Sequence, residues 1–216
     1  MKSFETNFKQ NLDFNPVLCL VTDRTNRSRE EFLTTLKATL EAGVTWVQLR
    51  EKAGASDREI WELGLHVRAL TQIYKVPLVV DDRLDLAMAL DADGVHLGQT
   101  DLPLAQARRL WPEGRIWGVS VHTREQAEQA HHEGATYLGV GALFPTASKA
   151  DAVPAAHAGV RDLTALGLPL IGIGGLTAER LPSVQALGCA GVAVISAIWG
   201  AEDPAAEVRR FRAAWG

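Results

Sequence analysis

The stretch Trp46–Asp81 reads WVQLREKAGASDREIWELGLHVRALTQIYKVPLVVD and contains a complete strand–helix–strand pattern. Its first part, Trp46–Arg50, and its last part, Pro77–Asp81, are short apolar runs of the length that buried strands have. Between them, Asp57–Tyr74 repeats apolar residues at helical spacing among charged ones. This order predicts two parallel strands joined by a crossover helix.

The same alternation continues along the chain on both sides of this stretch. Six further apolar runs of strand length occur, at Val17–Val21, Gly94–Gly98, Ile116–Val121, Tyr137–Phe144, Pro169–Gly174 and Gly191–Ser196. Helical periodicity appears between several of them, at Arg29–Ala42, Arg124–His132 and Ala178–Leu187, after the candidate N-caps Ser28, Thr123 and Thr177. Eight strand units with no interrupting domain predict an α/β protein with a single (β/α)8 TIM barrel. An open doubly wound sheet is the alternative fold.

Length and composition agree with one domain. The chain has 216 residues, of which 47% are hydrophobic and 22% charged, and this is enough for one full core. No linker interrupts the pattern, so we expect residues 16–216 to form the barrel catalytic domain. Residues 1–15 are polar, and we expect them to form an N-terminal tail or a covering segment.

Charge and cysteine content narrow the class of protein. The formal net charge is -4, which argues against a nucleic-acid partner. No apolar run approaches the ~20 residues of a membrane span, and the N-terminus lacks the apolar stretch of a secretory signal. Cys19 and Cys189 lie in separate apolar runs and are expected to be reduced core thiols. We therefore expect a cytoplasmic protein with no nucleic-acid or membrane partner; a homo-oligomer is left open.

The polar residues of the sequence gather where the predicted strands end, which is where β/α barrels carry their active sites. After Trp46, the side chains of Gln48, Arg50 and Lys52 share one face of the second strand, because strand side chains alternate with period two. If the apolar residues between them meet the helices, an amide and two cations point into the barrel mouth and form an anion site. The alternative is a solvated strand end with exposed cations.

Two carboxylates follow neighbouring strands. Asp82 comes after the third strand and Asp101 after the fourth. Mg²⁺ commonly takes one or two carboxylates together with substrate phosphate oxygens, so this pair predicts a magnesium site. Asp101 also has a structural alternative as the N-cap of the next helix, because Leu102 and Pro103 follow it.

Three further strand ends carry features of phosphate binding. The loop after the sixth strand contains Thr146, Ser148 and Lys149, which offer hydroxyl donors and a positive charge. The glycines at 172–175 let the backbone approach an anion closely, and backbone amides near Ser196 can complete an anion cup. On the fifth strand, Ser120 and His122 share a face and can both reach the pocket; a structural hydrogen bond is the alternative for His122.

These motifs resemble those of the thiamine-phosphate synthases (thiamine-phosphate pyrophosphorylases) over about Val17 to Pro204. The motifs that carry the resemblance are Gln48-Leu49-Arg50-Glu51-Lys52, Asp82-Arg83 with Asp85-Leu86-Ala87, Gly94-Val95-His96-Leu97-Gly98-Gln99 with Asp101, Gly118-Val119-Ser120, Phe144-Pro145-Thr146 with Lys149, Gly172-Ile173-Gly174-Gly175 and Val194-Ile195-Ser196-Ala197-Ile198. The resemblance implies a Mg²⁺-dependent transferase of thiamine biosynthesis. It would couple hydroxymethylpyrimidine diphosphate with hydroxyethylthiazole phosphate and release thiamine phosphate and pyrophosphate.

The resemblance also implies roles for individual residues. Those expected to contact the substrates are Gln48 at the pyrimidine, Arg50, Lys52 and Lys149 at the pyrophosphate, Ser120, Thr146 and Ser148 around the reacting groups, and Gly175, Ile195 and Ser196 at the thiazole phosphate. The catalytic residues among them are Arg50, Lys52, Ser120 and Lys149, and the metal ligands are Asp82 and Asp101.

Three positions depart from the family pattern. Asp81 stands where asparagine usually contacts pyrophosphate, and a carboxylate there would repel that group unless it is protonated, turned away or facing a metal. Ser148 stands where threonine is usual and keeps the hydroxyl. Cys19 stands where a pocket tyrosine is common.

Two other functions compete with the synthase. A thiazole tautomerase of the same superfamily would bind the thiazole phosphate alone and use a histidine at the position of His122 in proton transfer. In those relatives the metal and pyrophosphate residues are commonly lost, whereas this chain retains all of them, namely Arg50, Lys52, Asp82, Asp101 and Lys149. The other competitor is a non-catalytic sensor of phosphorylated ligands on the same scaffold.

Overall fold

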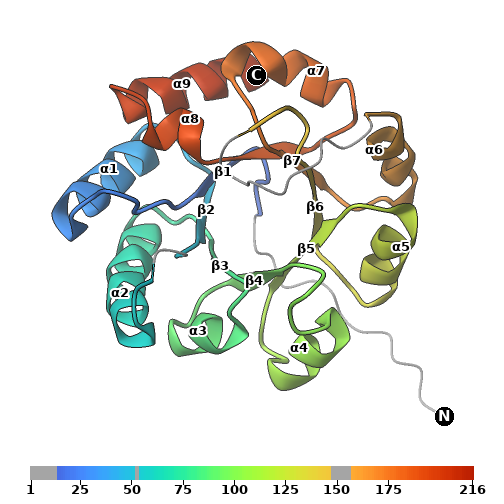
Figure 1. Ribbon diagram of the computed structural model, residues 1–216, viewed down its shortest axis with the longest axis horizontal. Coiled ribbons are helices and arrows are strands. Elements are labelled where there is room, and N and C mark those ends of the chain that lie inside the picture. The colour runs from blue at the N-terminus through green and yellow to red at the C-terminus, as the bar shows by residue number, and fades with distance from the viewer. Residues whose placement is uncertain (1–13, 52–53, 147–156) are drawn as a thin grey trace.

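The protein is a closed eight-stranded parallel barrel surrounded by helices (Figure 1). The computed structural model describes residues 14–51, 54–146 and 157–216. The strands are β1 (Leu18–Val21), β2 (Trp46–Leu49), β3 (Leu78–Asp81), β4 (Gly94–Leu97), β5 (Ile116–Val121), β6 (Tyr137–Gly141), β7 (Leu170–Ile173) and β8 (Gly191–Val194). Each pairs in parallel with its neighbours in the sequence, and β1 pairs with β8, as Leu18 lies opposite Val192. The predicted (β/α)8 barrel is therefore confirmed, and the open sheet is excluded.

Helices follow the strands and form the outer layer (Figure 1). Their bounds are α1 (Arg29–Glu41), α2 (Asp57–Ile73), α3 (Leu84–Ala89), α4 (Leu104–Leu110), α5 (Arg124–His132), α6 (His157–Leu163), α7 (Leu181–Gln185), α8 (Ser196–Trp199) and α9 (Pro204–Trp215), with short 3₁₀ turns at Thr164–Leu166 and Ala178–Arg180. The last helix, α9, lies against α1, α7 and α8 and so covers the junction where the barrel closes. None of the helices in the described residues combines the length and the apolar character that a membrane span needs.

The strand side chains divide into two buried clusters because alternate residues face opposite sides of the sheet. Val47 and Leu49 of β2 belong to the large cluster between the barrel and its helices. Trp46, from the same strand, belongs to a smaller cluster inside the barrel. The predicted orientation of the second strand is thus correct as far as Arg50, because Gln48 and Arg50 line the cavity on the interior side.

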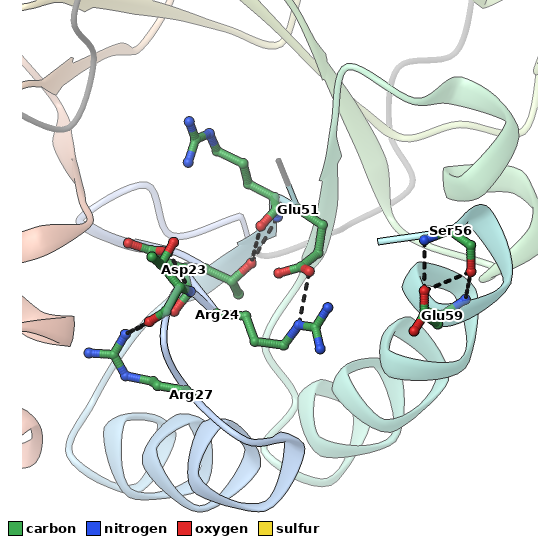
Figure 2. Close-up of polar contacts among 9 residues, drawn as sticks. Asp23, Arg24, Arg27, Glu51, Ser56 and Glu59 are labelled. Carbon is green, nitrogen blue, oxygen red and sulfur yellow. Dashed lines mark hydrogen bonds and ion pairs between the residues drawn. The ribbon is translucent and has the colours of Figure 1, made fainter. Parts of the chain in front are cut away.

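Capping explains where three of the helices begin. Ser28, Ser56 and Thr123 each accept a hydrogen bond from the backbone N–H three residues later, and the side-chain oxygen at that later position accepts one from the backbone N–H of the cap. Figure 2 shows this capping box at the start of α2, where Ser56 and Glu59 face each other. Thr177 occupies the N-cap position as predicted, but its side chain makes no capping bond and the segment opens with a 3₁₀ turn before α7.

Most strands agree with the predicted ranges to within one residue at each end, but two of them end two or three residues earlier than expected. The sixth ends at Gly141 rather than Phe144, and the eighth ends at Val194, after which Ser196 opens α8. In both places the chain leaves the ladder at the barrel mouth, and after β6 the backbone bonds to the loop that follows β7. Phe144 N–H, for example, donates to the carbonyl of Gly174 over 3.2 Å.

Aromatic rings fill the opposite end of the barrel. Phe14 precedes β1 and lies 5.3 Å from the ring of Trp46 and 5.8 Å from that of Tyr137, centroid to centroid. Nearby, the Asp93 carboxylate ties three segments together by accepting from Arg68 Nη1 at 2.7 Å, Leu78 N–H at 2.9 Å and Arg115 Nη2 at 2.7 Å. The base of the barrel is therefore closed, and the open end is the one where the strands finish.

Candidate active site

A cavity of about 740 Å³ opens where the eight strands end. Every candidate site residue that the structure describes lines it, namely Gln48, Arg50, Asp81, Asp82, Asp101, Ser120, Thr146, Gly175, Ile195 and Ser196. They come from loops and strand ends far apart in the sequence. Only the closed parallel topology brings all of these ends to one mouth. Lys52, Ser148 and Lys149, which the sequence also predicts for the site, lie outside the described residues.

Gln48, Arg50 and Asp81 form a group joined by a hydrogen bond and an ion pair on one wall of this cavity. Gln48 Nε2 donates to Asp81 Oδ1 over 2.6 Å, and Arg50 Nε lies 3.6 Å from Asp81 Oδ2. Because an ionised carboxylate only accepts, the contact fixes which end of the Gln48 amide faces Asp81. The Asp81 side chain, 10% exposed, is therefore turned toward an amide donor and a cation.

The backbone next to this group is folded sharply at Asp82. Asp82 has a φ of 61°, and Arg83 N–H donates to the carbonyl of Asp81 over 2.7 Å, so a three-residue turn ends β3. A positive φ is uncommon for a residue other than glycine and is concentrated at functional sites. The Asp82 N–H donates to the carbonyl of His96 over 2.8 Å, which ties the turn to β4.

Asp101 is held by the loop that follows β4. Its Oδ2 accepts from Gly98 N–H over 2.6 Å. The N-cap reading is wrong, because α4 begins at Leu104 with Pro103 in the cap position. The carboxylate instead braces its own loop at the cavity wall, next to Gly98 and Thr100.

The Arg50 backbone is clamped by Thr22, the residue that follows β1. Thr22 Oγ1 accepts from Arg50 N–H over 2.8 Å and donates to the Arg50 carbonyl over 3.0 Å. Glu51 points the other way, where its Oε2 accepts from Arg24 Nε over 3.0 Å (Figure 2). The Glu51 side chain is only 2% exposed, so this ion pair anchors the end of β2 against the loop after β1.

The cavity floor contains polar residues that sequence reasoning did not select. His96 bonds to Tyr137 Oη through Nδ1 and to Ser120 Oγ through Nε2, each over 2.9 Å. Period two places His96 on the same face as the glycines at 94 and 98, so the sequence signal was present. The strand register, which brings these three side chains together, could not be predicted from the sequence.

Glycines shape the wall formed by β7 and its loop. Gly174 and Gly175 have φ values of 96° and 62°, which favour glycine. A Cβ at Gly175 would lie 2.4 Å from the carbonyl oxygen of Pro145, so the two loops approach closely. Arg180 donates to the Gly175 carbonyl and lies over the ring of Phe144, 4.7 Å from its centroid. The loop after β7 is therefore braced from behind, with Ile195 and Ser196 beside it in the lining.

The structure also shows whether three other histidines and Cys19 reach the cavity. His122 lines the cavity at its exposed rim, and His131 and His132 are exposed on α5. Cys19 is fully buried in the inner cluster and does not line the cavity. Burial raises the pKa of the Cys19 thiol well above its ordinary value.

The acidic residues set the kind of metal that the site can hold. No group of three or more histidine, cysteine or acidic side chains suited to a metal ion occurs among the residues that the structure describes. Asp82 and Asp101 nevertheless line one cavity. Two carboxylates without further protein ligands suit a hard cation that is completed by water and substrate oxygens.

A closed β/α barrel with its polar cavity at the carboxyl ends of the strands defines a barrel enzyme. The chain matches the family model described as thiamine monophosphate synthase over residues 18–198. It is 46% identical over 200 residues to the thiamine-phosphate synthase of Desulfitobacterium hafniense strain Y51, covering 92% of this chain and 96% of the relative. The chain belongs to the thiamine monophosphate synthase family, and it is thus a transferase of thiamine biosynthesis.

The similarity to a solved structure agrees with this family assignment. The thiamine phosphate pyrophosphorylase from Pyrococcus furiosus has a TM-score of 0.86 and 37% identity, over 95% of this chain and 98% of that one. A 3-hexulose-6-phosphate synthase has a TM-score of 0.66 at 20% identity over 93% of this chain and 100% of that one. This second likeness extends to the fold alone.

Proposed function

We propose that the chain joins hydroxymethylpyrimidine diphosphate to hydroxyethylthiazole phosphate, with Mg²⁺, in the cavity at the barrel mouth. The observation that carries this proposal is the convergence of two kinds of anion-binding wall on one cavity. One wall contains Arg50 with Gln48 and two carboxylates, and the other is a glycine-rich backbone wall beside Ser196. Two phosphorylated substrates need two such walls.

The roles follow from the contacts of each residue. Gln48, oriented by Asp81, presents its remaining amide groups to the pyrimidine. Arg50, whose backbone is clamped by Thr22, directs a permanent positive charge to the diphosphate. The backbone at Gly175, Ile195 and Ser196 receives the thiazole phosphate, and Thr146 and Ser120 surround the reacting groups. Lys52, Ser148 and Lys149 stay predictions that rest on the family resemblance.

The chemistry needs charge stabilisation more than proton transfer. The bond between the pyrimidine methylene carbon and the diphosphate oxygen breaks, and its electron pair leaves with pyrophosphate. The thiazole nitrogen then attacks the methylene carbon with its own lone pair, so no general base is required. Fixed cations around the departing oxygens stabilise the charge that develops there, and such preorganised electrostatics is commonly the largest catalytic contribution.

Asp82 and Asp101 are the residues that would hold Mg²⁺. The bound ion supplies further positive charge to the diphosphate. The turn at Asp82 and the hydrogen bond from Gly98 to Asp101 hold both carboxylates at the cavity without substrate. The cytoplasmic location and any homo-oligomer also stay predictions.

The decisive experiment is an assay of pyrophosphate release by the purified protein with both substrates, each substrate alone, and with or without Mg²⁺. Release that needs both substrates and the metal, with thiamine phosphate formed in equal amount, supports the proposal. Asp82→Ala should lower turnover by orders of magnitude, whereas Asp91→Ala, at an exposed surface position, should not. Thiazole isomerisation without pyrophosphate release would instead identify a tautomerase, and tight product binding without turnover would identify a sensor.

A further inference from the structure

We propose that Tyr137 and His96 are positioning residues that fix the direction of the Ser120 hydroxyl, so that it donates a hydrogen bond to the bound pyrimidine diphosphate. The identity of that ligand rests on the proposed function. The polarity of the hydrogen-bond chain follows from the three side chains and their surroundings.

The three side chains come from adjacent strands and form a continuous chain across the cavity floor. Tyr137 Oη lies 2.9 Å from His96 Nδ1, and His96 Nε2 lies 2.9 Å from Ser120 Oγ. The rings of His96 and Tyr137 are also stacked, with centroids 5.5 Å apart and an interplanar angle of 24°. All three residues line the cavity. Each ring nitrogen of His96 therefore has a hydrogen-bond partner in this chain, Tyr137 at Nδ1 and Ser120 at Nε2.

The barrel leaves room for this arrangement by using glycine on the same interior face. A Cβ at Gly118 would lie 2.2 Å from Tyr137 Oη and 2.5 Å from His96 Nδ1. A Cβ at Gly139 would lie 3.0 Å from His96 Cε1. Any larger residue at Gly118 would displace the phenol or the imidazole, so the local sequence of β5 is matched to the pair.

Burial sets the direction of the first hydrogen bond. The Tyr137 side chain is fully buried, and desolvation raises the pKa of its hydroxyl well above the ordinary value, so it keeps its proton. Within the described residues, the hydrogen-bond partner of this hydroxyl is His96 Nδ1. If Nδ1 carried a proton, the single hydrogen of the phenol would be buried without an acceptor, which is unfavourable. Tyr137 therefore donates to Nδ1, and the neutral imidazole carries its proton on Nε2.

The second hydrogen bond then determines what Ser120 can do. Its Oγ accepts from His96 Nε2–H, so its own hydrogen is directed elsewhere. Ser120 is partly exposed to the cavity, where a substrate offers ring-nitrogen and phosphate-oxygen lone pairs. An isolated serine hydroxyl rotates and either donates or accepts, whereas this one is set as a donor.

Nitrogen NMR of the substrate-free protein with ¹⁵N-labelled histidine tests the polarity directly. A bare imidazole nitrogen resonates far downfield of a protonated one, and the His96 signals are identified by their contact to Tyr137. In the wild type we expect Nδ1 of His96 to be unprotonated and Nε2 to be protonated. In Tyr137→Phe we expect His96 no longer to keep a single fixed tautomer. A His96 protonated on Nδ1 would overturn the proposal, even in a protein that makes thiamine phosphate.

A double-mutant cycle tests the link to catalysis. Tyr137→Phe keeps the ring and should lower kcat/KM for the pyrimidine diphosphate by about tenfold, the loss expected for one hydrogen bond. In a Ser120→Ala background the same change should cost less than about twofold, because the hydroxyl to be oriented is gone. Tyr74→Phe, at the other tyrosine of the chain, removes a surface bond to Glu41 and serves as the control.

The outcomes of the cycle are distinct. Equal losses from Tyr137→Phe in both backgrounds would show that Tyr137 acts by packing alone and would overturn the proposal. Thermal unfolding of each variant checks the fold, and if Tyr137→Phe does not fold, the wild-type tautomer decides. Failure of the wild-type protein to form thiamine phosphate would contradict the proposed function, which the substrate-free NMR result does not depend on.

Discussion

Asp81 places a carboxylate in a cavity that we propose binds a diphosphate, and its contacts limit the repulsion expected there. Gln48 and Arg50 both face it, so part of its negative charge is directed at a cation and at an amide N–H. The same contacts have a second effect, because Arg50 shares its positive charge between Asp81 and any incoming phosphate. Asp81 thus orients Gln48 and also competes with the phosphate for Arg50.

Asparagine at position 81 should still orient Gln48, but it should no longer compete with an incoming phosphate for the charge of Arg50. Asp81→Asn keeps an oxygen that accepts from Gln48 and frees Arg50, so we expect kcat/KM for the pyrimidine diphosphate to be equal or higher. Asp81→Ala removes the acceptor as well, and we expect a loss of about tenfold. Steady-state kinetics of both variants check this, with Asp85→Asn at an exposed ion pair as the control. A large loss in Asp81→Asn would show that the charge itself has a positive role.

At the scale of elements, the loops are held by ion pairs that join one strand end to the next. Arg24 and Glu51 connect the loop after β1 to the end of β2 (Figure 2), and neither residue lines the cavity. The cavity-lining face of β2 is therefore positioned by residues that do not themselves line the cavity.

Neutralising Glu51 should weaken both the fold and the reaction. Glu51→Gln leaves Arg24 without its carboxylate in a site where Glu51 is almost fully buried, and we expect a loss of about 2 kcal/mol in the free energy of unfolding. We also expect a higher KM for the pyrimidine diphosphate, because Arg50 directly precedes Glu51 in the chain and its position depends on the same strand end. Denaturant unfolding and kinetics measure the two effects. Glu62→Gln, in a half-exposed pair with Arg29, should change neither.

The base of the barrel depends on a different carboxylate. Asp93→Asn keeps the side-chain volume but removes the charge that pairs with Arg68 and Arg115, and the Arg68 side chain is 13% exposed. We expect a loss of about 3 kcal/mol in the free energy of unfolding, with little change in kcat. Chemical denaturation measures the loss, and Asp91→Asn, whose side chain is 96% exposed, is the matched control. An unchanged stability in Asp93→Asn would contradict this role.

Elements were easier to predict than contacts. The strands were visible in the sequence because each is a short apolar run, and the eightfold repeat of such runs defined the barrel. The end of β6 at Gly141 was not visible, since the apolar run continues to Phe144 while the ladder stops. The bonds of His96 to Tyr137 and Ser120 could not be predicted either. They depend on the register of three strands, in which Gly118 lies opposite both His96 and Tyr137.

On the scale of the whole molecule, both cysteines are enclosed by the fold. Burial raises the pKa of Cys19 well above its ordinary value and that of Cys189 to about 11. A thiol whose pKa is raised by folding stabilises the native state fully below the unfolded pKa, near 9.0. That contribution is lost as the pH rises from there through the folded pKa. Alkaline conditions should therefore destabilise the protein.

The same burial predicts slow chemical labelling. At pH 8 a thiol reagent should modify native Cys19 and Cys189 only as fast as the protein opens, and the denatured chain should react at once. Mass spectrometry over time measures the modification. Ala105→Cys, at an exposed position on α4, provides a native thiol that should react immediately. Rapid labelling of the wild-type protein would contradict the enclosed position of both residues.

The pairing of β1 with β8 has a consequence for how the chain is made. Synthesis runs from the N-terminus, so β1 leaves the ribosome long before its partner Gly191–Val194 has been translated. Until then β1 has one unpaired edge, and the mouth lacks the wall near Ser196. The cavity therefore cannot be complete on a nascent chain that ends before β8. Premature termination anywhere upstream should yield open sheets with exposed edges, which are prone to aggregate rather than to act as weaker enzymes.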